Sequence, residues 1–260
     1  MLKIRVIPTL LWKNFGLVKG TAFDSWRRVG PVLPAIKVYN TRDVDELVLV
    51  DIIATQNSSS PDTKSVQDFA DECFVPLAVG GGITNLKQMQ ELLNAGADKV
   101  IINTAAYSEP RLIEQAAERF GSQCILASID ARRESDDSYL CYSGSGKTAT
   151  KKCPTTWAKE LENRGAGEII ITSIDRDGSM QGYDLELIKQ VTAIVNVPVI
   201  ASGGAGSYEH MRQAIQEAGA SAVAAASMFH FTEQTPAEAK LFLAKTGVPV
   251  RKTANEMSIK

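Results

Sequence analysis

The sequence predicts one (β/α)8 barrel, and three observations support this prediction. Eight short runs rich in β-branched and other apolar residues alternate with amphipathic segments of helical period, as expected for parallel strands buried on both faces. The two halves of the chain repeat one another over four strand–helix units, which an open doubly wound sheet has no reason to do. That rival fold would usually carry a GxGxxG turn after an early strand, and the sequence has none.

The elements alternate along the whole chain of 260 residues, which is long enough to bury one large core. Apolar runs predict strands at residues 3–10, 45–52, 76–80, 99–103, 124–130, 168–174, 198–204 and 221–227. Apolar residues at helical spacing predict helices over residues 66–74, 86–97, 110–121, 157–167, 185–195 and 208–220. No linker or low-complexity tract interrupts this order, so we expect one domain over residues 1–260.

The internal repeat defines the expected halves. Three pairs of segments align, separated by 122 or 123 positions: 45–52 with 167–174, 75–82 with 197–204, and 96–106 with 219–229. We therefore expect half-barrels over about residues 1–120 and 121–250, with a short tail at 251–260.

Composition excludes several classes of function. The net charge of −2 gives no electrostatic basis for binding nucleic acid or an anionic membrane. The N-terminus lacks the apolar core of a signal peptide, and no run is long enough to cross a membrane, so a cytoplasmic location is expected.

No metal or cofactor is expected. Cys73 and Cys124 are interpreted as core residues, and Cys141 and Cys153 as incidental thiols, because the four spacings match no zinc motif. The two histidines are too few and too scattered to form a metal site, and His230 is expected to be a packed residue. No nucleotide or redox motif is present.

Two glycine-containing strand ends are related by the repeat. We call them the N-terminal nest (Gly81, Gly82, Asn103 and Thr104) and the C-terminal nest (Gly203, Gly204, Ala226 and Ser227). Glycines let backbone N–H groups approach an anion, and a hydroxyl can complete such a site. One glycine pair is a weak signal, but two equivalent sites at the active end of a barrel predict a ligand with phosphates at both ends.

Polar residues lie between the two nests in the expected barrel. Asp130 is interpreted as a general acid or base, although a strand-end aspartate can also cap the next segment. Asp177 is the second candidate, in a loop with Gly178 that a simple turn explains almost as well. The remaining expected ligand-binding residues are Asp51, Thr172 and Ser202.

The opposite end of the barrel carries four charges at strand starts: Arg5, Glu46, Lys99 and Glu168. Charges entering a barrel core are costly unless paired, so a mutually neutralising ring is expected. Such a ring is consistent with a stabilising plug.

These motifs, with "GADKVIINTAA", "GAGEIIITSIDRDGSMQGYDLELI" and "AASMFHF", closely resemble the cyclase subunit of imidazole-glycerol-phosphate synthase over about residues 1–250. The resemblance implies a glutaminase docked at the N-terminal face of the barrel, which Asp98 would face. It also implies that the four-charge ring is the gate through which ammonia enters. Ammonia would then react at the top with a bis-phosphorylated ribulosyl formimino carboxamide ribonucleotide, and Lys19 belongs to the family's mobile first loop.

One position departs from that family. Leu11 aligns with Asp130 across the repeat, 119 positions apart, where the family has a second aspartate of an acid–base pair. Leucine can neither donate nor accept a proton, and loss of a participating acid or base costs roughly 10²–10⁴-fold in rate. Leu11 and Trp12 are also expected to add apolar surface to the pocket.

The N-terminal segment resembles a branch of the family found with surface-polysaccharide genes. In that branch the barrel is expected to pass ammonia to a separate sugar amidotransferase, which converts an acetamido group into an acetamidino group. This is the leading interpretation. The alternatives are a true cyclase/lyase of histidine biosynthesis working with Asp130, and a ligand-sensing activator of the glutaminase without chemistry of its own.

Overall fold

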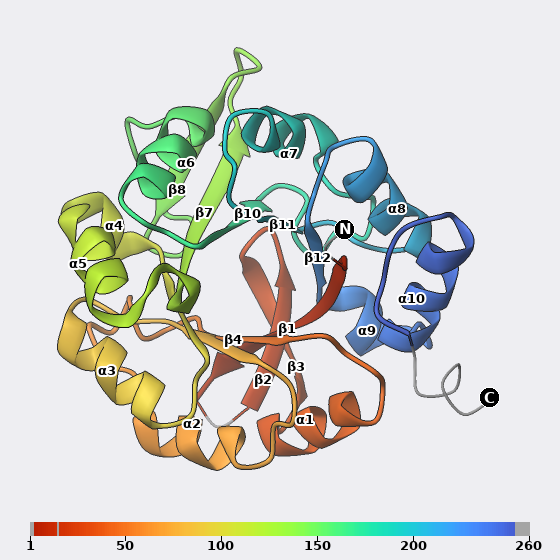
Figure 1. Cartoon of the computed structure of the whole chain (residues 1–260), viewed down its shortest axis with the longest axis horizontal. Helices are drawn as coiled ribbons and strands as arrows, with labels where there is room; N and C mark the ends of the chain where they lie inside the picture. The colour runs from red at the N-terminus through yellow and green to blue at the C-terminus, as the bar shows by residue number, and fades with distance from the viewer. Residues whose placement is uncertain (1–2, 15, 253–260) are drawn as a thin grey trace.

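The computed structural model describes residues 3–14 and 16–252, so part of the expected tail, residues 253–260, lies outside the described residues. Eight parallel strands form a closed barrel in which β10 pairs with both β7 and β11 (Figure 1). The barrel strands are β1 (Arg5–Lys13), β4 (Leu47–Asp51), β5 (Leu77–Gly80), β6 (Lys99–Ile102), β7 (Ile125–Arg133), β10 (Glu168–Ser173), β11 (Val199–Ser202) and β12 (Ala222–Ala225). Each falls on one of the eight predicted runs, and the (β/α)8 fold is confirmed.

Helices surround the barrel in Figure 1. They are α1 (Val32–Asn40), α2 (Thr63–Ala70), α3 (Leu86–Asn94), α5 (Arg111–Phe120), α6 (Pro154–Asn163), α7 (Leu185–Thr192), α8 (Tyr208–Gln216) and α10 (Pro236–Lys245). Shorter turns are α4 (Thr104–Ser108), α9 (Ser227–Phe231) and η1 (Ser122–Cys124). None of the helices in the described part of the chain is long and apolar enough to cross a bilayer.

Of the eight longer helices, α1 and α10 were missed from the sequence, and the predicted ends of α2, α3, α6, α7 and α8 lie three or four residues too far along the chain. Helix α10 begins with a complete capping box between Thr235 and Glu238, a signal that could have revealed it. Helix α1 was missed because it contains Pro34, which usually argues against a helix. Pro34 lies in the first turn, where proline is tolerated. Helix α2 ends at Ala70 rather than residue 74, because the chain there turns towards β5.

Two antiparallel hairpins extend from the top of the barrel. Strands β1 and β7 are nine residues long, and each continues into a hairpin: β2 (Gly16–Thr21) with β3 (Asp24–Gly30), and β8 (Tyr139–Ser143) with β9 (Thr148–Ala149). Leu11 pairs with Val18, and Asp130 pairs with Tyr142. Both repeat-related positions therefore lie where a barrel strand becomes the first strand of a hairpin.

The core has two parts. The larger part fills the space between strands and helices, and includes Trp12, Trp157 and the buried thiol of Cys141. The smaller part lies inside the barrel and consists of Ile7, Val48, Ala78, Ile101, Leu126, Ile170, Ile200, Ala222 and Ala224. Cys73 and Cys124 pack against the larger core as expected, and all four cysteines are free thiols.

A buried ion pair fastens the C-terminal helix to the barrel. The Lys240 side chain is 0% exposed, and its Nζ lies 3.2 Å from Oδ1 of Asp45, which Arg251 also contacts at 2.9 Å. The other carboxylate oxygen of Asp45 accepts the Val6 backbone N–H. Asp45 therefore links α10, the segment after it and the first barrel strand.

Candidate active site at the top of the barrel

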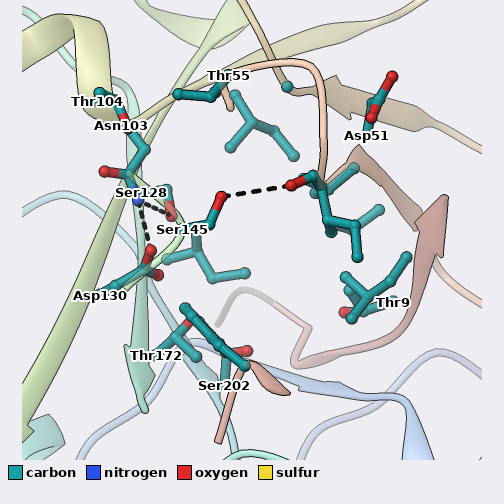
Figure 2. A pocket seen from close by; sticks show the side chains of 18 of the residues that line it. Thr9, Asp51, Thr55, Asn103, Thr104, Ser128, Asp130, Ser145, Thr172 and Ser202 are labelled. Atoms are coloured by element: carbon teal, nitrogen blue, oxygen red, sulfur yellow. Dashed lines mark hydrogen bonds between the residues drawn. The ribbon is translucent and has the colours of Figure 1, made fainter. Parts of the chain in front are cut away.

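A cavity of about 560 Å³ opens where the barrel strands end (Figure 2). It brings together all the residues that the sequence predicted for this face except Trp12: Leu11, Lys19, Asp51, Gly81, Gly82, Asn103, Thr104, Asp130, Thr172, Asp177, Gly178, Ser202, Gly203, Gly204, Ala226 and Ser227. Its floor includes Val48, Ile101, Ile170 and Ala224 of the inner core. One apolar layer therefore separates the cavity from the other end of the barrel.

Asp130 is a buried carboxyl group in this cavity. It is 8% exposed, and its Oδ2 accepts a hydrogen bond of 2.8 Å from Nδ2 of Asn103, as Figure 2 shows. Burial raises the pKa of Asp130 to about 7, the nearby Asp177 acts in the same direction, and the bond from Asn103 opposes them. Strand β7 continues three residues beyond it, so the capping interpretation is wrong. A carboxyl group with this pKa can exchange a proton near neutral pH.

Asp177 is held by the first hairpin rather than standing alone in a turn. The Lys19 ammonium, 2% exposed on β2, forms a direct ion pair with its Oδ2. The backbone carbonyl of Asp177 accepts the Ala22 N–H at 2.8 Å. The next position, Gly178, requires glycine, because a Cβ there would lie 2.1 Å from the Gly20 carbonyl oxygen. The hairpin is thus seated on the loop after β10.

Leu11 and Trp12 point in different directions. Leu11 lines the cavity, as expected from its alignment with Asp130. Trp12 does not: it is buried outside the barrel, in edge-on contact with Phe69 of α2, with ring centroids 5.3 Å apart. The expectation that Trp12 adds apolar surface to the pocket is wrong, because successive side chains of a strand point to opposite faces.

Several lining residues were missed. Phe23 and Trp26 come from the first hairpin, Ser145 from the turn between β8 and β9, Ser128 from β7 and Thr55 from the loop after β4. Neither hairpin was predicted, so their residues had no assigned place. Ser128 could have been found, because it lies two positions before Asp130 and so shares its face of the strand.

His230 is packed, as predicted. Its Nδ1 lies 3.3 Å from the Tyr39 hydroxyl, and its Nε2 lies 3.3 Å from the Thr9 carbonyl oxygen. Burial lowers the pKa of His230 to about 4, so the ring is neutral at ordinary pH.

The four charges at the opposite end form a closed ring. Arg5 and Lys99 each contact both Glu46 and Glu168, with N–O distances of 2.5 to 2.9 Å. Glu46 is buried and the other three are half-buried, and each charge has two partners of opposite sign, which offsets its loss of hydration. Asp98 is exposed at this same end, where its Oδ2 accepts the Leu77 N–H.

A closed barrel with a cavity at its strand ends, lined by carboxyl and hydroxyl groups among apolar side chains, is the arrangement of a barrel enzyme. Residues 5–235 match the family model described as "Histidine biosynthesis protein". The chain is 42% identical to imidazole glycerol phosphate synthase subunit HisF of Streptococcus mutans over 96% of this chain and 100% of that protein. It is 45% identical to the subunit of the same name from Hyphomonas neptunium, over 96% and 99%. The chain belongs to the HisF family of histidine-biosynthesis proteins.

Proposed function

We propose that this chain is the synthase subunit of a glutamine amidotransferase complex, and that ammonia reaches its top cavity through the barrel. The observation that carries the proposal is the order of layers inside the barrel: a four-charge ring, one apolar layer, then a cavity that contains the titratable Asp130. Ammonia is small and uncharged, so an apolar interior lined by Ala78, Ala222 and Ala224 suits it better than it suits an ion.

We compare two candidate acceptors for that ammonia. The relatives' names support the formation of imidazole glycerol phosphate, and they favour this reading over sugar amidination, to which no name points. Leu11 is the one observation that favours the second candidate, ammonia delivery for amidination of an acetamido sugar by a separate amidotransferase. It places an alkyl side chain in the cavity where the repeat has a carboxyl group at Asp130.

The discriminating experiment uses the purified chain alone with excess ammonium salt at alkaline pH, which supplies ammonia without a glutaminase. The bis-phosphorylated ribulosyl substrate is added, and its disappearance is followed for the parent chain and for Leu11→Asp. Turnover by the parent near an ordinary ~10 s⁻¹ supports the cyclase and contradicts the amidination candidate. Turnover only by Leu11→Asp shows that this one side chain holds the cyclase reaction off. No turnover by either protein would support ammonia delivery to another acceptor. Stimulation of the glutaminase without ammonia transfer would support an activator role.

The glutaminase is proposed to dock at the N-terminal end of the barrel, and Phe74 is our candidate anchor there. Its side chain is 79% exposed, on the loop that leads into β5. Asn40 holds this loop by accepting the Phe74 N–H at 3.2 Å and donating to the Glu72 carbonyl at 2.7 Å. A rigidly presented aromatic side chain is typical of an interface hot spot.

Replacing Phe74 with alanine is expected to weaken glutaminase binding by about 10- to 100-fold, the size of a hot-spot truncation. The affinity is measured by titration calorimetry with the partner glutaminase. Met180→Ala is the matched control, since this exposed side chain lies beyond β10 at the opposite end. Equal affinities for the parent and Phe74→Ala would remove Phe74 from the docking face.

A further inference from the structure

Two of the four free thiols lie close together where the second hairpin meets helix α6. Cys141 is on β8, and Cys153 is the residue immediately before α6. Figure 1 shows α6 beside β8, and the two elements are in contact. Neither thiol belongs to the described residues that line the top cavity, so this pair is separate from the candidate active site.

Backbone hydrogen bonds set the distance between the two cysteines. The Cys141 N–H donates to the Lys152 carbonyl at 2.9 Å, and this carbonyl belongs to the peptide unit that leads into Cys153. The Cys141 carbonyl accepts the Thr150 N–H at 2.8 Å, which fixes the same segment a second time. Standard peptide dimensions then place the Cα atoms of Cys141 and Cys153 within about 6.5 Å of each other. Disulfides join Cα atoms that are about 4.4–6.8 Å apart, so the backbone is already at a bonding separation.

The two thiols share the space between β8 and the start of α6. Cys141 is 0% exposed and belongs to the same core cluster as Trp157, which lies one turn into α6. Burial raises the pKa of Cys141 to about 12, and Cys153 is close enough to raise it further. Cys141 is therefore a protonated thiol that solvent does not reach, and Cys153 is its neighbour across this space.

Cys153 has the properties of a reactive thiol. It is half-buried rather than buried, and its Sγ lies 3.3 Å from the Thr155 hydroxyl and 3.0 Å from the Thr156 hydroxyl. Burial alone would raise the pKa of Cys153, but hydrogen bonds from these hydroxyls and from backbone N–H groups of the helix start outweigh it, so the pKa lies below its ordinary value. Cys73 differs, because burial raises its pKa. The thiolate is the form that peroxides oxidise, so Cys153 is expected to react before Cys73 or Cys141.

We propose that Cys153 and Cys141 form a reversible thiol pair that is oxidised by peroxides. The Cys153 thiolate attacks one peroxide oxygen, the O–O bond breaks, and Cys153 becomes a sulfenic acid while the other oxygen takes up protons and leaves as water. The Cys141 sulfur then attacks the sulfenic sulfur, an S–S bond forms, and the sulfenic oxygen leaves with the Cys141 proton as a second water. The two cysteines lose two electrons and the peroxide gains them. A dithiol reductant reverses the change by thiol–disulfide exchange.

The disulfide would fasten the second hairpin to α6. The turn of this hairpin reaches the cavity: the Gly144 N–H donates to the Thr104 hydroxyl at 3.0 Å, and Ser145 donates to the Ile52 carbonyl at 3.3 Å, as Figure 2 shows. Oxidation would therefore restrict the movement of a segment that covers the cavity. The inference replaces the expectation of two incidental thiols, and it does not depend on which acceptor receives the ammonia.

The test treats the full reduced chain with hydrogen peroxide at pH 7, blocks the remaining thiols with N-ethylmaleimide, and maps the peptides by mass spectrometry. The number of free thiols is expected to fall from four to two, with Cys141 linked to Cys153, and dithiothreitol is expected to restore all four. Cys141→Ser is expected to stop at the sulfenic acid, so that dimedone labels Cys153 in this variant. Cys73→Ser is the matched control and should form the same link as the parent.

The inference is overturned if peroxide leaves all four thiols free, if the link joins another pair, or if dimedone labels Cys153 in the parent and no link forms. The peptide map of the parent needs no substitution, so it stands even if Cys141→Ser fails to fold. Guanidinium chloride unfolding measures the consequence: the oxidised chain should have a higher denaturant midpoint, because a cross-link restricts the unfolded chain, and dithiothreitol should return it to the reduced value. A lower midpoint after oxidation would show that the bond disrupts native contacts, and would also overturn the inference.

Discussion

Replacing Asp130 with asparagine is expected to stabilise the folded chain at pH 8 by up to about 4 kcal/mol. The cause is burial, which raises the pKa of this carboxyl group from its ordinary 3.8 to about 7. Asparagine has the same shape, carries no charge, and can still accept the bond from Asn103. The measurement is urea unfolding of the parent and the variant at several pH values.

The pH dependence has a definite sign. Between pH 4 and 7 the folded parent keeps a proton that the unfolded chain has released, so the parent loses stability as the pH rises through this window. The advantage of the variant should therefore be absent near pH 4 and complete above pH 7. Asp68→Asn on the exposed face of α2 is the control and should have little effect at any pH. A variant less stable than the parent at pH 8 would contradict the buried-charge account.

Replacing Asp45 with alanine is expected to destabilise the chain by about 3–5 kcal/mol, the usual cost of breaking a buried ion pair. The substitution leaves the Lys240 ammonium fully buried without its counter-ion and removes the acceptor of the Val6 N–H. The loss is measured by the denaturant midpoint at pH 7, where the parent and the variant should share the same slope.

A double variant isolates the cause of that loss. Adding Lys240→Met removes the unpaired charge while keeping a long side chain, so Asp45→Ala with Lys240→Met should recover part of the stability that Asp45→Ala loses. If the double variant were less stable than Asp45→Ala, the unpaired ammonium would not be the cause.

The barrel was predictable because its signals are local and repeated. Each strand run contains an unbroken apolar stretch, such as residues 169–171, which is typical of a strand covered on both faces. The predicted ligand-binding residues follow from the fold for a related reason: a barrel brings its strand ends to one face, and these residues line the cavity there. Trp12 is the exception, because it points to the opposite face of β1. The ring of Arg5, Glu46, Lys99 and Glu168 follows from the same rule applied to the strand starts.

The hairpins were not predictable in this way. Residues 16–30 include exposed Arg27 and Arg28, and the strand alternation that marks a sheet is weak there, because β3 has no core on either face. Their positions depend on distant contacts such as Lys19 with Asp177, which no local pattern contains. The hydrogen bond from the Gly144 N–H to the Thr104 hydroxyl was missed for the same reason, since the two residues lie 40 positions apart.

The two hairpins also make the halves of the chain depend on one another. The arm that follows β1 rests on residues of the second half, through Lys19 with Asp177 and through Arg27 over the Phe231 ring. The arm that follows β7 rests on the first half, through Ser145 with Ile52 and Lys147 with Gln56. A chain cut near residue 120 would give two fragments, and the hairpin of each fragment would have its contact residues on the other fragment. Neither fragment could cover its own strand ends with its hairpin. Reassociation of the fragments would therefore close the barrel and place both hairpins over the cavity in a single step.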